Sequence, residues 1–214
     1  MVEVKICGVC RAKDARAAAD AGAAWVGVIL APGRRRSRTM AQAAVIFEAV
    51  PVRRVGVFVD APADVVIAAA GALALDAVQL HGDEPVELVR RIRDAVEAEV
   101  WKALRVQGTA DFAHGAAAYA HWTDALLLDG WSADAHGGAG ARFDWEGIAA
   151  AGVPYGARLI VAGGLTPENV ATAVTLLAPS MVDVSSGVEA APGRKSAARM
   201  QAFVAAARGA RTPR

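Results

Sequence analysis

The sequence has little cysteine, few aromatic residues and almost no net charge. Two cysteines are too few for the disulfide framework of a small secreted protein. Lysine and arginine total 23 against 22 aspartate and glutamate residues, so nucleic acid and anionic membranes are not expected as main partners. No run of apolar residues approaches the ~20 that a membrane span requires. The first residues of the sequence lack the pattern of a signal peptide. We therefore expect a cytoplasmic protein.

What the sequence does contain is a large share of apolar residues, 55%, against 21% charged residues. Disordered chains are poorer in apolar residues and carry more net charge, so this composition indicates a folded protein with a large core. A chain of 214 residues fits one large domain better than two complete ones. We expect a single domain over residues 1–214.

Short β-branched runs alternate with alanine-rich segments that carry charges at helical spacing. The expected strands are Val2–Cys7, Ala24–Leu30, Val52–Val59, Asp76–Leu80, Val100–Leu104, Asp124–Asp129, Arg158–Ala162 and Met181–Ser185. The expected helices are Ala12–Ala21, Ala41–Val50, Ala63–Ala70, Pro85–Ala98, Ala110–Ala120, Trp145–Ala151, Pro167–Leu177 and Lys195–Arg208. A glycine-rich stretch, Gly137–Gly140, is expected to form a loop after the sixth strand.

The regular alternation of strand and helix predicts the fold. Strands joined through helices form parallel sheets by right-handed crossovers. Eight such units in about 200 residues match the lower size limit of a (β/α)8 barrel. The sequence therefore predicts the α/β class and a TIM barrel. A doubly wound open sheet is the alternative, and it usually has fewer strands.

Reactive or anion-binding groups occur near the carboxyl end of nearly every expected strand, where barrel enzymes place their active sites. The polar side chains at these strand ends are Lys5, Cys7, Asp60, Gln79, His81, Lys102 and Asp129. Residues two apart on a strand face the same side, so Lys5 shares a face with Cys7, and Gln79 with His81. His81 alone would more often be a structural histidine than a catalyst.

Cys7 is the candidate base or nucleophile. A neighbouring Lys5 ammonium would favour the thiolate and lower the pKa of the thiol. The alternative is a buried structural cysteine. Cys7 and Cys10 also spell C-x-x-C, but no second cysteine pair exists to complete a zinc site. We expect no role for Cys10, and no metal or nucleotide cofactor.

Glycine-rich turns follow the last two expected strands. Gly163-Gly164 precedes a helix, and Ser185-Ser186-Gly187 lies one unit later. Glycines let backbone N–H groups approach an anion, and these two loops form the usual phosphate site of a barrel. Ordinary turn glycines are the alternative, but two matched loops favour phosphate binding.

A basic loop follows the second expected strand and contains Arg34, Arg35, Arg36 and Arg38. Such a run is usually a solvated face. On the rim of an active site, in a protein of balanced charge, it fits recognition of one carboxylate or phosphate better.

Together these residues resemble the phosphoribosylanthranilate isomerase family of tryptophan biosynthesis. The resemblance spans essentially the whole chain in the order of the family. The matching segments are VKICG (Val4–Gly8), GVFV (Gly56–Val59), VQLHGDE (Val78–Glu84), LLLDG (Leu126–Gly130), GGAGARFDW (Gly137–Trp145), AGGLTPENV (Ala162–Val170) and VDVSSGVEAAPGRK (Val182–Lys195).

The resemblance implies a small-molecule substrate, N-(5-phosphoribosyl)anthranilate, and an Amadori rearrangement of it. By resemblance, Asp129 is the general acid, Cys7 the general base, and Arg36 binds the anthranilate carboxylate. Backbone amides around the two glycine-rich turns would hold the phosphate. The expected substrate-binding residues are Lys5, Arg36, Gln79, His81, Gly163, Gly164, Ser185, Ser186 and Gly187. The expected assembly is a monomer or a homodimer.

Some positions depart from the pattern of the family. Arginines replace its usual Ser-Pro-Arg-Tyr loop, so Arg35 or Arg38 could substitute for Arg36. Asp60 stands where asparagine is common, and Ala141-Arg142 replaces a frequent Lys-Thr. The alternatives are another phosphate-binding barrel isomerase or lyase, and a non-enzymatic redox or metal-binding module built on the two cysteines.

Overall fold

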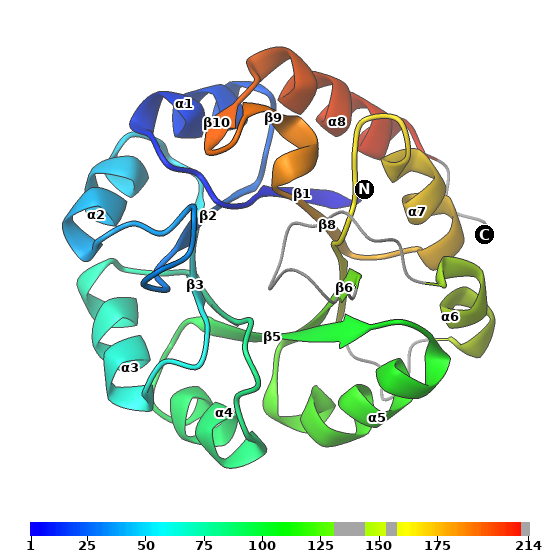
Figure 1. Ribbon diagram of the computed structural model, residues 1–214, viewed down its shortest axis with the longest axis horizontal. Helices are drawn as coiled ribbons and strands as arrows, with labels where there is room; N and C mark the ends of the chain where they lie inside the picture. The colour runs from blue at the N-terminus through cyan, green and yellow to red at the C-terminus, as the bar shows by residue number, and fades with distance from the viewer. Residues whose placement is uncertain (131–143, 153–157, 211–214) are drawn as a thin grey trace.

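A computed structural model describes residues 1–130, 144–152 and 158–210, which form a closed barrel of parallel strands inside a ring of helices (Figure 1). The strands are β1 (Glu3–Ile6), β2 (Trp25–Ile29), β3 (Arg53–Phe58), β4 (Ala77–Leu80), β5 (Glu99–Val106), β6 (Ala125–Gly130), β7 (Arg158–Val161) and β8 (Met181–Val184). The helices are α1 (Ala12–Asp20), α2 (Met40–Glu48), α3 (Ala63–Ala72), α4 (Val86–Arg93), α5 (Thr109–Tyr119), α6 (Trp145–Ala151), α7 (Val170–Leu177) and α8 (Ala197–Gly209).

The barrel closes where β1 pairs with β8. Lys5 of β1 lies beside Trp25 of β2 on one side and Asp183 of β8 on the other. Every neighbouring pair from β1 to β8 is parallel. The predicted (β/α)8 fold is confirmed, and the open-sheet alternative is wrong.

Side chains fill the interior of the barrel as a packed core. Trp25 and Trp101 meet edge to face there, with ring centroids 4.8 Å apart. Their indole N–H groups donate to Glu3 and Glu99, which begin β1 and β5. The two tryptophans therefore fill the interior toward the amino ends of the strands. A second core, formed by the outer faces of the strands and the inner faces of the helices, surrounds the barrel.

A hairpin between β8 and α8 was not predicted. It pairs β9 (Glu189–Ala191) with β10 (Arg194–Lys195). Pro192 and Gly193, with φ +74° at Gly193, form the turn, as the sequence preferences of a type II turn explain. The prediction that a helix begins at Lys195 is therefore wrong. Helix α8 begins after Ser196, whose side chain accepts a hydrogen bond from Arg199 N at 3.3 Å.

Most other predicted boundaries lie within two residues of the observed ones. Helix α7 begins at Val170 rather than Pro167, because the side chain of Asn169 is bonded into the preceding turn. Helix α4 ends at Arg93, and the chain turns before β5 instead of continuing to Ala98. The predicted loop Gly137–Gly140 and the pair Ala141-Arg142 lie outside the described residues.

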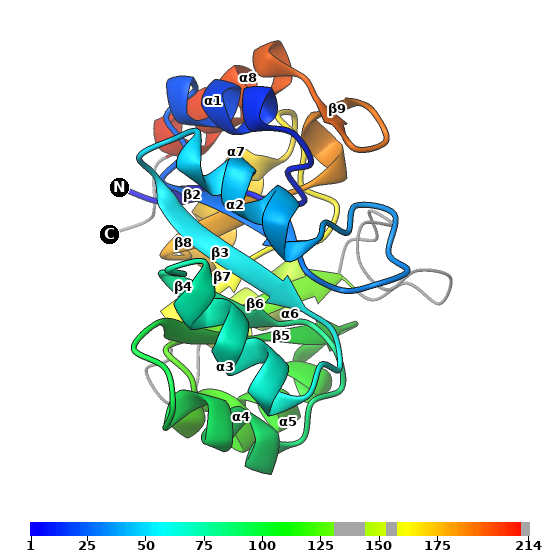
Figure 2. The same cartoon turned by 90° about the vertical axis from the view of Figure 1, so that its left-hand side faces the viewer.

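The two ends of the barrel differ. Figure 2 shows both chain termini at one end, and the loop between β2 and α2 together with the β9–β10 hairpin at the other. This second end is the carboxyl end of the strands, where barrel enzymes place their chemistry. In the described part of the chain, no helix is both long and apolar enough to cross a membrane.

Candidate active site

A cavity of about 480 Å³ opens at the carboxyl end of the barrel. The predicted site residues that line it are Cys7, Arg36, Gln79, His81, Asp129, Gly163, Gly164, Ser185, Ser186 and Gly187. Residues predicted from separate strand ends are therefore brought around one space. Lys5 lies below this lining, fully buried in the barrel.

Lys5 and Cys7 approach each other over Gly27 of β2. A Cβ atom at Gly27 would lie 3.1 Å from Lys5 Nζ and 3.3 Å from Cys7 Sγ, so a side chain there would crowd both groups. The Lys5 ammonium also donates to Asp183 Oδ2 at 2.9 Å. The strand alternation that placed Lys5 beside Cys7 is confirmed, and Asp183 completes a buried ionic group under the cavity.

The prediction that the pKa of the Cys7 thiol is lowered is wrong. Burial raises this pKa more than any other influence, because a thiolate loses its solvation inside the barrel. The Lys5 ammonium opposes burial by charge and hydrogen bonding, Asp183 adds to the rise, and Lys195 opposes it. Lys5 thus acts in the predicted direction, but burial outweighs it, and the net shift is upward.

Asp129 is linked to two other predicted residues. Its Oδ2 lies 3.0 Å from His81 Nε2, and His81 Nδ1 lies 2.8 Å from the amide nitrogen of Gln79. Because an amide nitrogen can only donate, His81 Nδ1 accepts from Gln79, so Nε2 carries the imidazole proton and donates to Asp129. The carboxyl group is thereby held by one oxygen.

Arg36 is the arginine of the basic loop that is most firmly fixed at the cavity. Its Nε and Nη2 donate to the two carboxylate oxygens of Glu189 at 2.7 and 2.8 Å. Arg34 and Arg35 also line the cavity. Arg38 instead donates through Nε to the carbonyl oxygen of Cys10, so it does not replace Arg36 at the site.

The two glycine-rich turns meet at the cavity. Gly163 and Gly164 have φ angles of +76° and +63°, which suit glycine. Asn169 fixes this turn by donating to the carbonyl oxygen of Gly164 and accepting from the backbone N–H of Thr166. A Cβ atom at Gly187 would lie 1.9 Å from the carbonyl oxygen of Leu165, so glycine permits the second turn to pack on the first.

Sequence reasoning missed three charged residues around the site: Asp183, Glu189 and Lys195. Asp183 could have been found, because it lies two residues before Ser185 and so shares its face of β8. Glu189 and Lys195 gave no such signal, since they belong to the unpredicted hairpin.

Cys10 and Asp60 hold the surrounding loops. The Cys10 thiol points to the carbonyl oxygens of Gly8 and Arg36, at 3.5 and 3.7 Å. Asp60 has φ +50°, a conformation that asparagine also tolerates, and its Oδ1 accepts from Asp83 N at 2.6 Å. Lys102 is paired with Glu84 at 3.0 Å. Among the described residues, no group of three or more histidine, cysteine, aspartate or glutamate side chains is placed to hold a metal ion.

A barrel with a buried thiol, a carboxyl group, an arginine and two glycine turns around one cavity at the carboxyl end of its strands belongs to the class of TIM-barrel enzymes. Residues 4–206 match the family N-(5'phosphoribosyl)anthranilate (PRA) isomerase. A relative of that name from Geobacter sulfurreducens is 46% identical over 211 residues, which cover 98% of this chain and 100% of the relative. The chain therefore belongs to the phosphoribosylanthranilate isomerase family, and it is an isomerase of tryptophan biosynthesis.

Solved structures agree with this assignment. The crystal structure of phosphoribosyl anthranilate isomerase from Thermotoga maritima has a TM-score of 0.89 and 37% identity, over 98% of this chain and 100% of that one. A further phosphoribosyl anthranilate isomerase structure holds reduced 1-(o-carboxyphenylamino)-1-deoxyribulose 5-phosphate. It has a TM-score of 0.84 and 37% identity over the same shares of the two chains.

Proposed function

We propose that this chain converts N-(5-phosphoribosyl)anthranilate to the 1-deoxyribulose 5-phosphate product by an Amadori rearrangement, with Asp129 as general acid and Cys7 as general base. The observation that carries this assignment is their placement on one cavity together with Arg36 and the two glycine turns. A thiol and a carboxyl group supply the two proton-transfer groups that the reaction requires.

The acid opens the sugar ring. Protonated Asp129 delivers its proton to the furanose ring oxygen, the bond from that oxygen to carbon 1 breaks, and the anthranilate nitrogen supplies the electron pair that forms the Schiff base. His81 supports this step, because it holds Oδ2 of Asp129 and so fixes the direction of the carboxyl group. A fixed orientation of this kind lowers the entropy cost of reaching the geometry in which the proton is transferred.

The base completes the isomerisation. The Cys7 thiolate removes the proton from carbon 2, and the electrons of that bond move toward the Schiff base to give an enolamine. Tautomerisation of the enolamine yields the ketose. Lys5 and Lys195 assist because their positive charges favour the thiolate against the effect of burial.

The two charged groups of the substrate are assigned to different partners around the cavity. Arg36 is the proposed partner of the anthranilate carboxylate, and backbone N–H groups around Gly163, Gly164, Ser186 and Gly187 are proposed to hold the phosphate. Within the described part of the chain, Gln79 Oε1 and Asp183 Oδ1 are buried acceptors with no hydrogen-bond donor. Both residues line the cavity, and we assign these oxygens to the hydroxyl groups of the sugar.

The proposal extends to the organisation of the chain. Pairing of β1 with β8 and a family match over residues 4–206 support one domain over residues 1–214. The proposed partner is the small-molecule substrate, with the protein as a monomer or a homodimer. Sedimentation equilibrium distinguishes these two assemblies.

The deciding experiment follows the fluorescence of freshly made N-(5-phosphoribosyl)anthranilate as the protein is added. The proposal predicts loss of fluorescence with the wild type and a severe loss of rate with Cys7→Ser. A wild-type protein that leaves the substrate unchanged contradicts the proposed reaction. A redox or metal-binding module using the C-x-x-C pair would instead depend equally on Cys7 and Cys10.

A further inference from the structure

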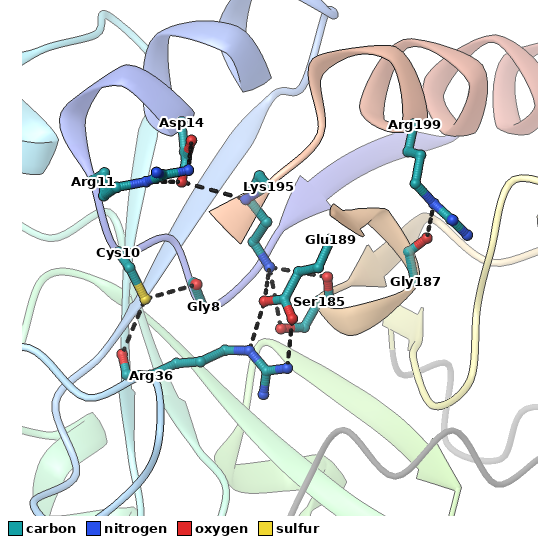
Figure 3. A network of polar contacts seen from close by, with 10 residues as sticks. All are labelled: Gly8, Cys10, Arg11, Asp14, Arg36, Ser185, Gly187, Glu189, Lys195 and Arg199. Carbon is teal, nitrogen blue, oxygen red and sulfur yellow. Dashed lines mark hydrogen bonds and ion pairs between the residues drawn. The ribbon is translucent and has the colours of Figure 1, made fainter. Parts of the chain in front are cut away.

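The Arg36 guanidinium group is bound along one edge by Glu189 of the β9–β10 hairpin. Glu189 binds Nε and Nη2 of Arg36 through both carboxylate oxygens (Figure 3). The Glu189 side chain is only 6% exposed and that of Arg36 14%. The pair is therefore a largely buried, bidentate contact between the loop after β2 and the segment after β8, rather than a solvated surface ion pair.

Lys195 joins this pair to the phosphate turn. Its ammonium group donates to Glu189 Oε1 at 3.2 Å, to the carbonyl oxygen of Ser185 at 2.9 Å and to Ser185 Oγ at 3.4 Å. The Lys195 side chain is fully buried. Ser185 is the first residue of the second glycine turn, so one lysine contacts both the partner of Arg36 and the start of the proposed phosphate site.

The hairpin keeps Glu189 and Lys195 side by side. They are directly paired in the register of β9 and β10. The backbone N–H of Lys195 also donates to Asp14 Oδ2 at 3.4 Å, and Asp14 is itself held by Arg11. The backbone that carries Lys195 is thereby attached to helix α1, and the lysine does not depend on the exposed turn of the hairpin for its position.

Arg36 and Ser185 also meet over Gly8, next to Cys7. A Cβ atom at Gly8 would lie 2.8 Å from Arg36 Cδ and 2.9 Å from Ser185 Oγ. The loop that carries Arg36 and the turn that begins at Ser185 are therefore neighbours beside Cys7. Glu189 contacts Arg36, and Lys195 contacts both Glu189 and Ser185, so these two residues connect the loop to the turn.

The geometry leaves Arg36 able to bind a second carboxylate. A guanidinium group has five N–H donors on a planar frame. Glu189 takes the edge formed by Nε and Nη2. The edge formed by Nη1 and the other N–H of Nη2 can still present two parallel donors to a ligand.

The charges of Arg36, Glu189 and Lys195 together suit the binding of one ligand carboxylate. Burial acts to raise the pKa of Glu189, but its contacts with Arg36 and Lys195 outweigh burial and lower it, so this carboxylate is ionised at neutral pH. Burial lowers the pKa of Lys195, and Glu189 opposes that effect. With Lys195 charged, two cations and one anion leave a single positive charge, which one ligand carboxylate neutralises.

We propose that Glu189 and Lys195 are positioning residues that set the specificity of the site for a substrate carrying an aromatic carboxylate. Glu189 fixes the direction in which Arg36 presents its free edge, and Lys195 supplies the remaining positive charge and couples this edge to the phosphate turn. This inference rests on the proposed function, because it takes the carboxylate of the substrate as the ligand of Arg36.

The test compares two ligands by calorimetry. One is reduced 1-(o-carboxyphenylamino)-1-deoxyribulose 5-phosphate, and the other is the same compound without the ring carboxylate. The ratio of their dissociation constants measures what the carboxylate contributes. The variants are Glu189→Gln and Lys195→Met. The control is Glu99→Gln, which removes another arginine-to-glutamate pair, with Arg158, at the opposite end of the barrel.

We expect the carboxylate ratio to fall about tenfold in Glu189→Gln, because Arg36 is no longer held in the orientation that gives the ligand carboxylate a charge-assisted hydrogen bond. The affinity for the ligand without the carboxylate should change little in this variant, and KM should rise more than kcat falls. Lys195→Met should lower the ratio and also weaken both ligands, because Ser185 loses its contact. Glu99→Gln should leave the ratio unchanged.

A wild-type carboxylate ratio in a folded Glu189→Gln or Lys195→Met protein overturns the proposal, whatever the melting temperature does. Circular dichroism establishes which variants fold, and either folded variant decides the matter. If the wild type shows a large carboxylate ratio but fails to convert N-(5-phosphoribosyl)anthranilate, the proposed reaction fails while the positioning role stands. A purely structural pair would change stability and leave the ratio unaltered.

Discussion

His81 Nε2 lies 3.0 Å from Asp129 Oδ2, which joins strand ends β4 and β6 across the mouth of the barrel. The contact leaves the other carboxyl oxygen, Oδ1, on the side of Gly163. One oxygen of Asp129 is thus held by His81, and the other is the oxygen from which the proposed proton transfer would start. An acid that must reach one particular ring oxygen requires such a fixed orientation.

The two cysteines should differ sharply in their effect on activity. Cys7→Ser is expected to lower kcat by about 10²–10⁴-fold, because a serine hydroxyl is a poor base near neutral pH. Cys10→Ser should retain most activity, since the hydrogen bonds of its thiol go to backbone carbonyl oxygens, which a serine hydroxyl can also reach. Steady-state assays of both variants make the comparison, and equal losses would point to a redox or metal pair instead.

The pH dependence should reflect the raised pKa of Cys7. Because the thiolate is the base, a raised pKa means that the active fraction grows as pH rises above neutrality, so kcat/KM should increase toward alkaline pH. Lys5→Met removes a charge that favours the thiolate and should shift the curve to still higher pH.

The thiolate can also be titrated directly by its ultraviolet absorbance, in a Cys10→Ser background that leaves Cys7 as the sole cysteine of the chain. A flat kcat/KM profile between neutral and alkaline pH, with no titrating thiol, would contradict Cys7 as the base.

Arg36 should matter mainly for binding. Arg36→Ala is expected to raise KM by the factor that corresponds to ~1.5–3 kcal/mol, the contribution of a hydrogen bond to a charged group. Arg35→Ala is the matched control, because Arg35 also lines the cavity but is exposed. A larger effect at Arg35 than at Arg36 would move the carboxylate site by one residue.

Gly163 should tolerate no side chain. A Cβ atom there would lie 2.2 Å from Gly130 N and 2.8 Å from Asp129 Oδ1, in addition to the strain of φ +76°. Gly163→Ala should lower both the melting temperature and kcat. Gly152→Ala, with φ +73° and no neighbour within 4 Å among the described residues, should lose only about 1–3 kcal/mol through strain and keep its activity. Equal kcat values for the two variants would show that Gly163 does not constrain Asp129.

Much of the barrel could be predicted because short, mostly apolar runs alternate with alanine-rich helical segments along the chain. Within a strand, the two-residue alternation of side chains also placed Lys5 beside Cys7, and Gln79 beside His81. It could not show that His81 meets Asp129, because alternation gives the face of a strand and not the partner across the barrel.

The parts that could not be predicted depend on how deeply a side chain is buried and on segments outside the regular strands and helices. The direction of the Cys7 pKa is set by how completely the thiol is buried, which sequence spacing does not reveal. Glu189 and Lys195 lie on a short hairpin with too few residues for a periodic signal. The choice of Arg36 within the basic loop came from the family resemblance, and its contact with Glu189 needed the folded structure.

The most direct test of the account is a titration of wild type and Asp129→Asn with reduced 1-(o-carboxyphenylamino)-1-deoxyribulose 5-phosphate, paired with turnover of N-(5-phosphoribosyl)anthranilate. Asparagine keeps the size of the side chain and an oxygen for His81, but it cannot give a proton to the ring oxygen. We predict that turnover falls by at least about 10²-fold while the dissociation constant stays within about threefold, because binding and proton transfer are separable. Turnover close to that of the wild type in Asp129→Asn would contradict Asp129 as the general acid.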